Sequence, residues 1–217
     1  MKIFSSLFII FTVVFAGCIS QTSQEVNINL MSCVPVTYSN NIIGSGVVVK
    51  CIKKDIEQNE YIIDVLTAKH VAVIPDLRLV INNVSLKVES IYHDTLDVAI
   101  LRCVSASPVA PVKYQISNPR PLEIVYTVGY PLGIGQVITT GIINHSVTNI
   151  SEGGWLCSSP AMPGNSGGGV FNSKGELLGI TVCIVYIENN NTEIPVPHLQ
   201  VFIPINIFSE WLSISTK

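Results

Sequence analysis

Residues 163–169 of this 217-residue chain read Pro-Gly-Asn-Ser-Gly-Gly-Gly, a single serine among glycines. Such a stretch is compatible with an ordinary loop. It is also the setting that a nucleophilic serine requires, because glycine permits a tight turn whose backbone N–H groups converge on a developing oxyanion. A catalytic role for Ser166 demands two partners, a histidine as general base and a carboxylate that orients the histidine.

Both partners are present in suitable settings. Residues 66–71 (Leu-Thr-Ala-Lys-His-Val) place His70 at the end of a strand-like run, and Asp97 directly precedes the apolar run 98–101. The order His70, Asp97, Ser166 is that of the two-barrel serine proteases and differs from the orders in subtilisins and α/β-hydrolases. Together the three segments predict a serine-protease triad.

Other titratable residues compete for these roles. His93 lies four residues before Asp97 and is interpreted as a loop histidine, because the strand context favours His70. Asp94 is an alternative third member, and Asp97 is preferred because the apolar run follows it directly. His145 and His198 have no partner motif and are predicted to be surface residues.

The chain is rich in short apolar runs separated by Gly, Pro and Asn, which predicts strands. The expected strands cover residues 46–51, 61–66, 78–82, 98–104, 124–128, 137–143, 177–185 and 201–205. Helical periodicity is confined to a short C-terminal segment, about 207–214. Regularly spaced short strands indicate an all-β sandwich or barrel system, with 105–121 as the connection between two halves.

These segments resemble the trypsin-like serine protease superfamily, and the resemblance is closest to the protease domain of HtrA/Deg-type enzymes. It spans about residues 42–206. The matching motifs are Gly-Ser-Gly-Val-Val-Val at 44–49, Thr-Ala-Lys-His at 67–70, Asp-Val-Ala-Ile-Leu at 97–101, Val-Gly-Tyr-Pro-Leu-Gly at 128–133, Thr-Thr-Gly-Ile-Ile at 139–143, Gly-Asn-Ser-Gly-Gly at 164–168, Gly-Glu-Leu-Leu-Gly-Ile at 175–180 and Phe-Ile-Pro-Ile-Asn at 202–206.

The resemblance implies two six-stranded antiparallel Greek-key barrels of the chymotrypsin-like fold, with the active site in the cleft between them. The protease domain would span 18–217, with barrel one at about 28–108 and barrel two at about 120–206. It further implies Ser166 as nucleophile, His70 as base and then acid, and Asp97 as the orienting carboxylate. The backbone N–H groups of Gly164 and Ser166 would form the oxyanion hole.

Two positions depart from the related families. Gly169 stands where HtrA-type enzymes often have proline, and Asn165 stands where digestive trypsins have an aspartate that pairs with a newly cleaved N-terminus. No Ile-Val-Gly-Gly start is visible, so activation of the trypsin type is not expected. Few residues follow position 206, and we therefore expect no PDZ domain and no PDZ-guided regulation.

The substrate pocket is expected to be formed by the stretch before Ser166 and the strand after it, and its predicted residues are Pro160, Ala161, Met162, Ile180, Thr181 and Val182. The stretch before Ser166, residues 157–163, contains no acidic residue, which argues against selection of Lys or Arg at P1, the substrate residue whose carbonyl is attacked. Thr181 stands where glutamate-specific relatives have a histidine. A small or medium apolar P1 residue is therefore expected.

The first 17 residues form a short basic start and an uncharged apolar run, the layout of a signal peptide. Residues 15–18 (Phe-Ala-Gly-Cys) resemble a lipobox, and two interpretations stay open: Cys18 carries a lipid that tethers the protein to a membrane, or a cysteine stands there by chance. Either way the protein is expected to be exported, as a secreted, periplasmic or cell-surface protein. Six cysteines fit such a compartment, and the pairs Cys51–Cys103 and Cys157–Cys183 are the disulfides guessed from strand ends.

The composition excludes some partners. The formal charge is −3 and no cluster of Lys or Arg occurs, so no nucleic-acid partner is expected. No cysteine or histidine spacing predicts a metal site, and no cofactor is expected. The sequence thus predicts a serine endopeptidase acting on a protein or peptide, through an acyl-enzyme. The alternative is a non-catalytic peptide-binding module on a protease fold.

Overall fold

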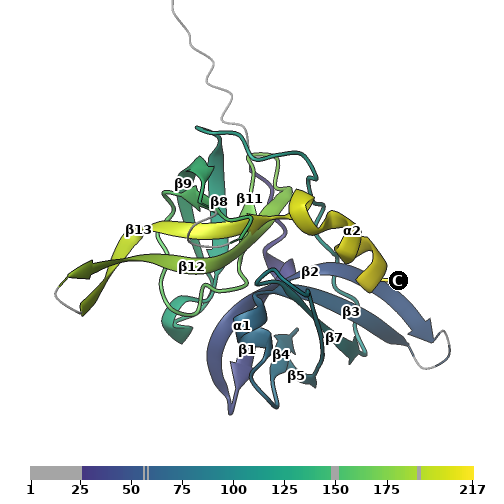
Figure 1. Cartoon of the computed structure of the whole chain (residues 1–217). Coiled ribbons are helices and arrows are strands. Elements are labelled where there is room, and N and C mark those ends of the chain that lie inside the picture. Colours follow the sequence, from purple (N-terminus) through teal and green to yellow (C-terminus); the bar gives the residue numbers. More distant parts are fainter. Residues whose placement is uncertain (1–25, 56, 58, 148–151, 190–191) are drawn as a thin grey trace, which may run out of the picture.

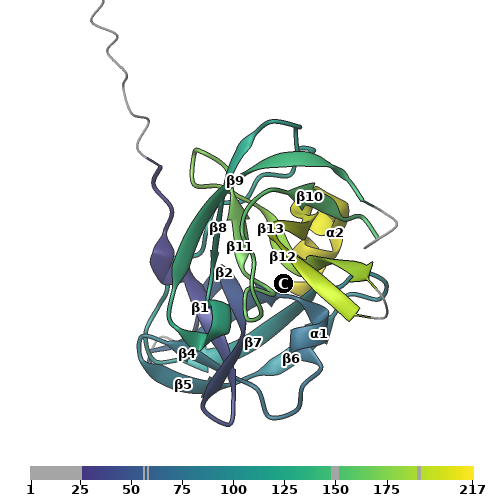
Figure 2. The same cartoon turned by 90° about the vertical axis from the view of Figure 1, so that its left-hand side faces the viewer.

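The computed structural model describes residues 26–55, 57, 59–147, 152–189 and 192–217. The predicted signal peptide and Cys18 lie outside the described residues. Two antiparallel sheets follow one another along the chain, one above the other in Figure 1, and a turned view is given in Figure 2.

The first sheet has seven strands in the order β5-β4-β1-β2-β3-β7-β6. Its strands are β1 (Cys33–Tyr38), β2 (Asn41–Asp55), β3 (Glu60–Thr67), β4 (Arg78–Ile81), β5 (Val84–Lys87), β6 (Glu89–Tyr92) and β7 (Ala99–Ser105). A 3-10 turn, η1 (Leu30–Ser32), leads into β1, and a one-turn helix, α1 (Lys69–Ala72), follows β3.

The second sheet closes into a six-stranded barrel in the order β10-β13-β12-β11-β8-β9. Its strands are β8 (Ile124–Gly129), β9 (Val137–Ser146), β10 (Trp155–Cys157), β11 (Gly169–Phe171), β12 (Leu177–Asn189) and β13 (Thr192–Pro204). The 3-10 turn η2 (Pro131–Gly133) follows β8, and helix α2 (Ile205–Ser215) ends the chain. The far ends of β12 and β13 form a hairpin that projects from the barrel (Figure 1).

The predicted all-β, two-lobed, chymotrypsin-like architecture is confirmed, with one correction. The first lobe is a curled seven-stranded sheet instead of a closed six-stranded barrel. The additional strand arises because Asn82 and Asn83 both adopt positive φ (49° and 63°) and join β4 to β5 as a two-residue hairpin. Asparagine tolerates this left-handed conformation better than most residues.

Strand β3 leads directly to helix α1, which carries His70. Its residues from Ile63 to Thr67 are all fully buried, on both faces of the strand, between its neighbours β2 and β7. One of these buried residues is charged: Asp64 accepts two hydrogen bonds from Arg102 on β7, at 2.7 and 2.9 Å. Arg102 also donates to the carbonyl of Ser215, so the pair ties this sheet to the end of α2.

The guessed disulfides are wrong. All five cysteines in the described part of the chain are free thiols. Cys51 on β2 and Cys103 on β7 both lie opposite Ile63, so strand β3 stands between them. Cys157 and Cys183 are likewise separated by β13, where they lie opposite Gln200 and Val201. Since adjacent strands are already about 4.8 Å apart, two strand spacings exceed the reach of a disulfide.

The C-terminal helix begins two residues before the expected start and buries Ile205, Phe208 and Leu212. Within the described residues, no helix has the length and apolar character needed to cross a membrane.

Candidate active site

His70 lies on α1, directly after β3, and Asp97 lies in the loop before β7. The ring nitrogen Nδ1 of His70 is 2.7 Å from Asp97 Oδ2, and the backbone N–H of His70 donates to Asp97 Oδ1 at 2.8 Å. Both carboxylate oxygens therefore hold one residue. With Nδ1 directed at Asp97, Nε2 is the ring atom left to exchange a proton with a substrate group.

The carboxyl group of Asp97 is held in its charged form. Partial burial raises the pKa of Asp97. The hydrogen bonds from the ring and backbone of His70, together with the backbone N–H of Lys69, lower it by a larger amount, so that the pKa lies below its usual value. An ionised Asp97 can stabilise the imidazolium that forms when His70 accepts a proton.

The competing residues serve other purposes. His93 Nδ1 accepts a hydrogen bond from the backbone N–H of Leu96 at 3.1 Å, and its ring meets the edge of Trp211. Lys69 Nζ donates to the backbone carbonyls of His93 and Asp94. The loop that carries Asp97 is thus held in shape by these contacts, while the Asp94 residue is exposed.

Ser166 lies in the loop between β10 and β11, and its glycine neighbours allow this loop to contact the first sheet. Gly167 has a φ of +84°, and a Cβ there would lie 2.1 Å from the Ser45 carbonyl and 2.2 Å from Thr67 Oγ1. Thr67 is three residues before His70. The glycine that follows Ser166 is therefore required both by its backbone conformation and by the close approach of β2 and β3.

A second contact brings Ser166 and His70 into the same neighbourhood. A Cβ on Gly44 would lie 2.7 Å from Val71, the residue after His70, and 3.3 Å from the carbonyl of Ser166. Among the described residues, no hydrogen bond involves Ser166 Oγ. Catalytic hydrogen bonds are often long or poorly aligned before substrate binds, so the absence of a hydrogen bond at Ser166 Oγ is compatible with a triad.

The backbone N–H groups of Gly164 and Ser166, on either side of Asn165, have no acceptor among the described residues. The carbonyl oxygens of the same two peptide units are hydrogen-bonded. Leu132 N–H donates to the Pro163 carbonyl at 2.7 Å, and Gly168 N–H donates to the Asn165 carbonyl at 2.8 Å. Because N–H and C=O point in opposite directions in a trans peptide, these bonds also set the direction of the two free N–H groups.

The predicted pocket residues fall into two groups. Ala161, Ile180, Thr181 and Val182 are buried, whereas Met162 is 42% exposed and Pro160 is partly exposed. Thr181 also fixes the nucleophile loop, since its carbonyl accepts a hydrogen bond from Gly167 N–H at 2.7 Å.

A buried polar residue beside this pocket has no signal in the local sequence. Gln200 is fully buried; it accepts a hydrogen bond from Thr181 Oγ1 and donates to Thr127 Oγ1. No local motif marks Gln200, because its partners come from other strands of the barrel.

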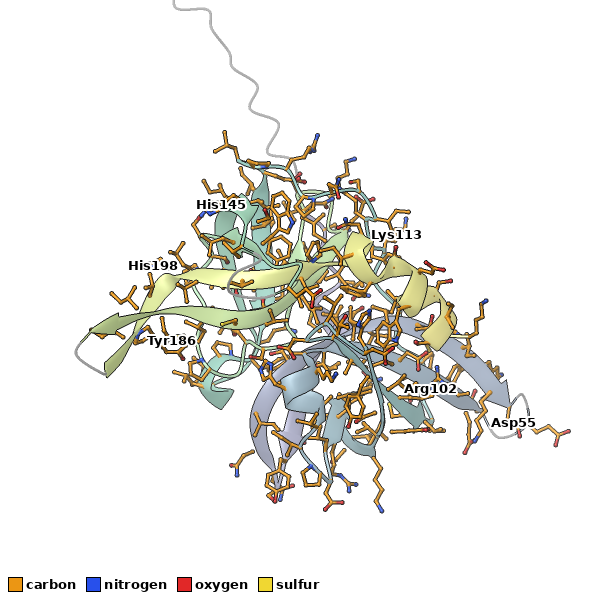
Figure 3. All side chains as sticks on the ribbon, in the orientation of Figure 1. Asp55, Arg102, Lys113, His145, Tyr186 and His198 are labelled. Atoms are coloured by element: carbon orange, nitrogen blue, oxygen red, sulfur yellow. The ribbon has the colours of Figure 1, made fainter. Side chains whose placement is uncertain are left out.

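The remaining histidines lie away from the pair. His145 and His198 are exposed, on β9 and β13 of the second barrel (Figure 3). Across the described ranges, no group of three or more His, Cys, Asp or Glu side chains could hold a metal ion.

The fold and the His70–Asp97 pair beside a glycine-flanked serine define the class as a chymotrypsin-like peptidase domain. Residues 44–180 match the family model described as the trypsin-like peptidase domain, and the chain belongs to this family.

Its curated relatives are HtrA/DegP-type serine proteases. The chain is 27% identical over 161 residues to a probable periplasmic serine protease do/HhoA-like of Haemophilus influenzae, covering 70% of this chain and 33% of that protein. It is 26% identical over 168 residues to the periplasmic serine endoprotease DegP of Salmonella typhimurium, covering 69% and 31%. The chain thus spans about a third of the length of these relatives.

Solved structures agree on the fold. The serine endoprotease from Yersinia pestis superposes with a TM-score of 0.63 at 24% identity, covering 88% of this chain and 65% of that one. The inactive form of the Rv3671c protease gives a TM-score of 0.63 at 18% identity, covering 85% and 88%.

Proposed function

We propose that this protein is a serine endopeptidase that hydrolyses peptide bonds through Ser166, His70 and Asp97. The observation that carries the proposal is the arrangement of the two lobes. The first holds a histidine whose ring is fixed by an ionised carboxylate, and the second presses a glycine-flanked serine against the strand that leads to that histidine.

In the proposed reaction, Ser166 Oγ attacks the scissile carbonyl while His70 Nε2 takes its proton, and Asp97 stabilises the resulting imidazolium. The negative charge on the carbonyl oxygen is received by the free N–H groups of Gly164 and Ser166. His70 then donates its proton to the leaving amine, and water hydrolyses the acyl-enzyme by the same route in reverse.

We infer a small or medium apolar P1 residue, because the proposed pocket residues are apolar or neutral and the buried ones carry no charge. A carboxylate would be needed to select Lys or Arg. Cleavage of a peptide library, read by mass spectrometry, tests this preference; cleavage concentrated after Lys, Arg or Glu would contradict it.

We further propose export, since the relatives from Haemophilus and Salmonella are described as periplasmic. Mass spectrometry of the mature N-terminus would distinguish a lipid on Cys18 from a free secreted chain.

A fluorophosphonate probe tests the activity itself. The probe phosphonylates a serine only when that serine is activated, so the wild type should be labelled and Ser166→Ala should not. His70→Ala, which leaves Ser166 in place, should also escape labelling. A folded wild type that resists the probe would support the alternative of a peptide-binding module and refute the enzyme.

A further inference from the structure

We propose that Ser45 is a positioning residue for the oxyanion hole, held in the first sheet and acting on the nucleophile loop of the second barrel. The inference rests on the proposed function and extends it to a residue outside the triad. Ser45 lies on β2 and is 1% exposed, so its polar atoms must find partners within the protein.

The Ser45 hydroxyl bridges two segments of the second lobe. Its Oγ donates to the carbonyl of Gly164 at 2.7 Å and accepts from the backbone N–H of Tyr130 at 2.9 Å. Among the described residues, the Gly164 carbonyl and the Tyr130 N–H make no other hydrogen bond. Removing the hydroxyl would therefore leave a partly buried acceptor and a partly buried donor unpaired.

The backbone of Ser45 makes two further contacts at the same junction. Its N–H donates to the carbonyl of Ser166 at 2.8 Å, and its carbonyl accepts from Thr67 Oγ1 at 2.7 Å. Ser45 thus hydrogen-bonds to the carbonyl groups of both residues that carry the proposed oxyanion donors, and to the end of the strand that leads to the proposed base.

Gly164 is the position where this support matters most. Its φ of +96° is accessible to glycine, and a Cβ there would lie 2.6 Å from the Tyr130 carbonyl. The peptide before Gly164 is held by Leu132 N–H on the Pro163 carbonyl, and the peptide after it is held by Ser45 Oγ. Without the second bond, the peptide after Gly164 would lose its anchor, and the flexible glycine could then change the angle at which its N–H meets the oxyanion.

A positioning role predicts a loss in the rate of chemistry and little change in substrate binding, because oxyanion contacts strengthen in the transition state. For Ser45→Ala we expect kcat on a peptidyl anilide with an apolar P1 residue to fall by about 10- to 100-fold, with KM changed by less than about threefold. Inhibition by the corresponding peptide boronate, whose tetrahedral adduct occupies the hole, should weaken by a similar factor of about 10- to 100-fold.

Two variants separate positioning from stability. Ser45→Thr keeps the hydroxyl and should restore most of kcat. Ser32→Ala is a matched control, because Ser32 is also fully buried and its Oγ donates to a backbone carbonyl, that of Ala110, outside the site. Ser32→Ala should lower the melting temperature and leave kcat and boronate inhibition close to the wild type.

The inference is overturned if folded Ser45→Ala keeps kcat within about twofold of the wild type, loses activity through KM alone, or is matched in its kcat loss by Ser32→Ala. If Ser45→Ala does not fold, Ser45→Cys, which keeps similar volume and a weaker hydrogen bond, takes its place with the same criteria. A folded wild type that resists fluorophosphonate would overturn the proposed function and this inference together; a reactive wild type with an unaffected Ser45 variant would overturn this inference alone.

Discussion

The two carboxylate oxygens of Asp97 hold two different groups of His70: Oδ2 lies 2.7 Å from the ring nitrogen Nδ1, and Oδ1 accepts a hydrogen bond from the backbone N–H at 2.8 Å. The backbone bond fixes the start of α1 and the ring bond fixes the direction of the imidazole. Position and orientation of the proposed base therefore depend on one side chain.

Asp97→Asn should keep the size of this side chain and remove its charge. An amide can offer its NH₂ group to Nδ1, which favours the wrong tautomer of the ring, and it no longer stabilises an imidazolium. We expect kcat/KM on a peptide substrate to fall by about 10²- to 10⁴-fold, measured with an apolar peptidyl anilide.

Asp94→Asn is the matched control, three residues away in the same loop. Asp94 contributes its backbone carbonyl, not its side chain, to the bond with Lys69, so the substitution leaves that contact intact. Activity should stay within about twofold of the wild type. Equal losses in the two variants would contradict the assignment of Asp97.

The lowered pKa of Asp97 predicts a pH-dependent contribution to stability. A carboxyl group whose folded pKa lies below the ordinary value of 3.8 contributes stability that is present above that value and is lost as the pH falls through the folded pKa. We expect the difference in free energy of unfolding between the wild type and Asp97→Asn to shrink as the pH falls from about 5 to about 3. Urea unfolding over this range measures it, and a difference that grows toward acid would contradict the lowered pKa.

The Asp64–Arg102 pair should be important for stability, because the Asp64 side chain is fully buried and its two oxygens are both paired with Arg102. Arg102→Ala leaves a buried charge without a partner and also releases the Ser215 carbonyl at the end of α2. We expect a loss of about 3–5 kcal/mol in the free energy of unfolding, measured by urea denaturation.

Lys54→Ala is the comparison for that experiment. Lys54 forms an ion pair with Glu60 at 2.9 Å, but its side chain is 47% exposed. Water screens such a pair, so the loss should stay below about 1 kcal/mol. Similar losses in the two variants would mean that burial of Asp64 does not determine the outcome.

The long, apolar strands were predictable from sequence because their own residues favour strand formation. The expected strands at 61–66 and 98–104 correspond to β3 and β7. By contrast β5 and β6 have four residues each and are largely exposed, and β10 and β11 have three residues each. Such short strands depend on the hydrogen bonds of neighbouring strands, which local sequence does not reveal.

The same distinction applies to the candidate site. The Ser166 and His70 motifs are local and can be identified from the sequence alone, whereas the Ser45 hydroxyl bonds to Gly164 across 119 positions of the chain. The disulfide predictions fail for a related reason. Strand order decides which cysteines are neighbours, and β3 and β13 lie between the predicted partners. The strands also end elsewhere than expected, since β2 runs to Asp55 and β12 runs to Asn189.

Free and buried thiols should resist alkylation in the folded protein. Burial raises the pKa of Cys33 to about 12, and burial, together with the charge of nearby Asp64, raises that of Cys103 to about 12. The thiolate is the reactive form, so at about pH 8 we expect iodoacetamide to modify the partly exposed Cys51 before either of them, and all three after unfolding in urea. Peptide mapping by mass spectrometry, done without reductant, measures both the labelling of each cysteine and any disulfide-linked peptide. A peptide that links Cys51 to Cys103 would contradict the strand order. Rapid labelling of Cys33 in the folded protein would contradict its burial.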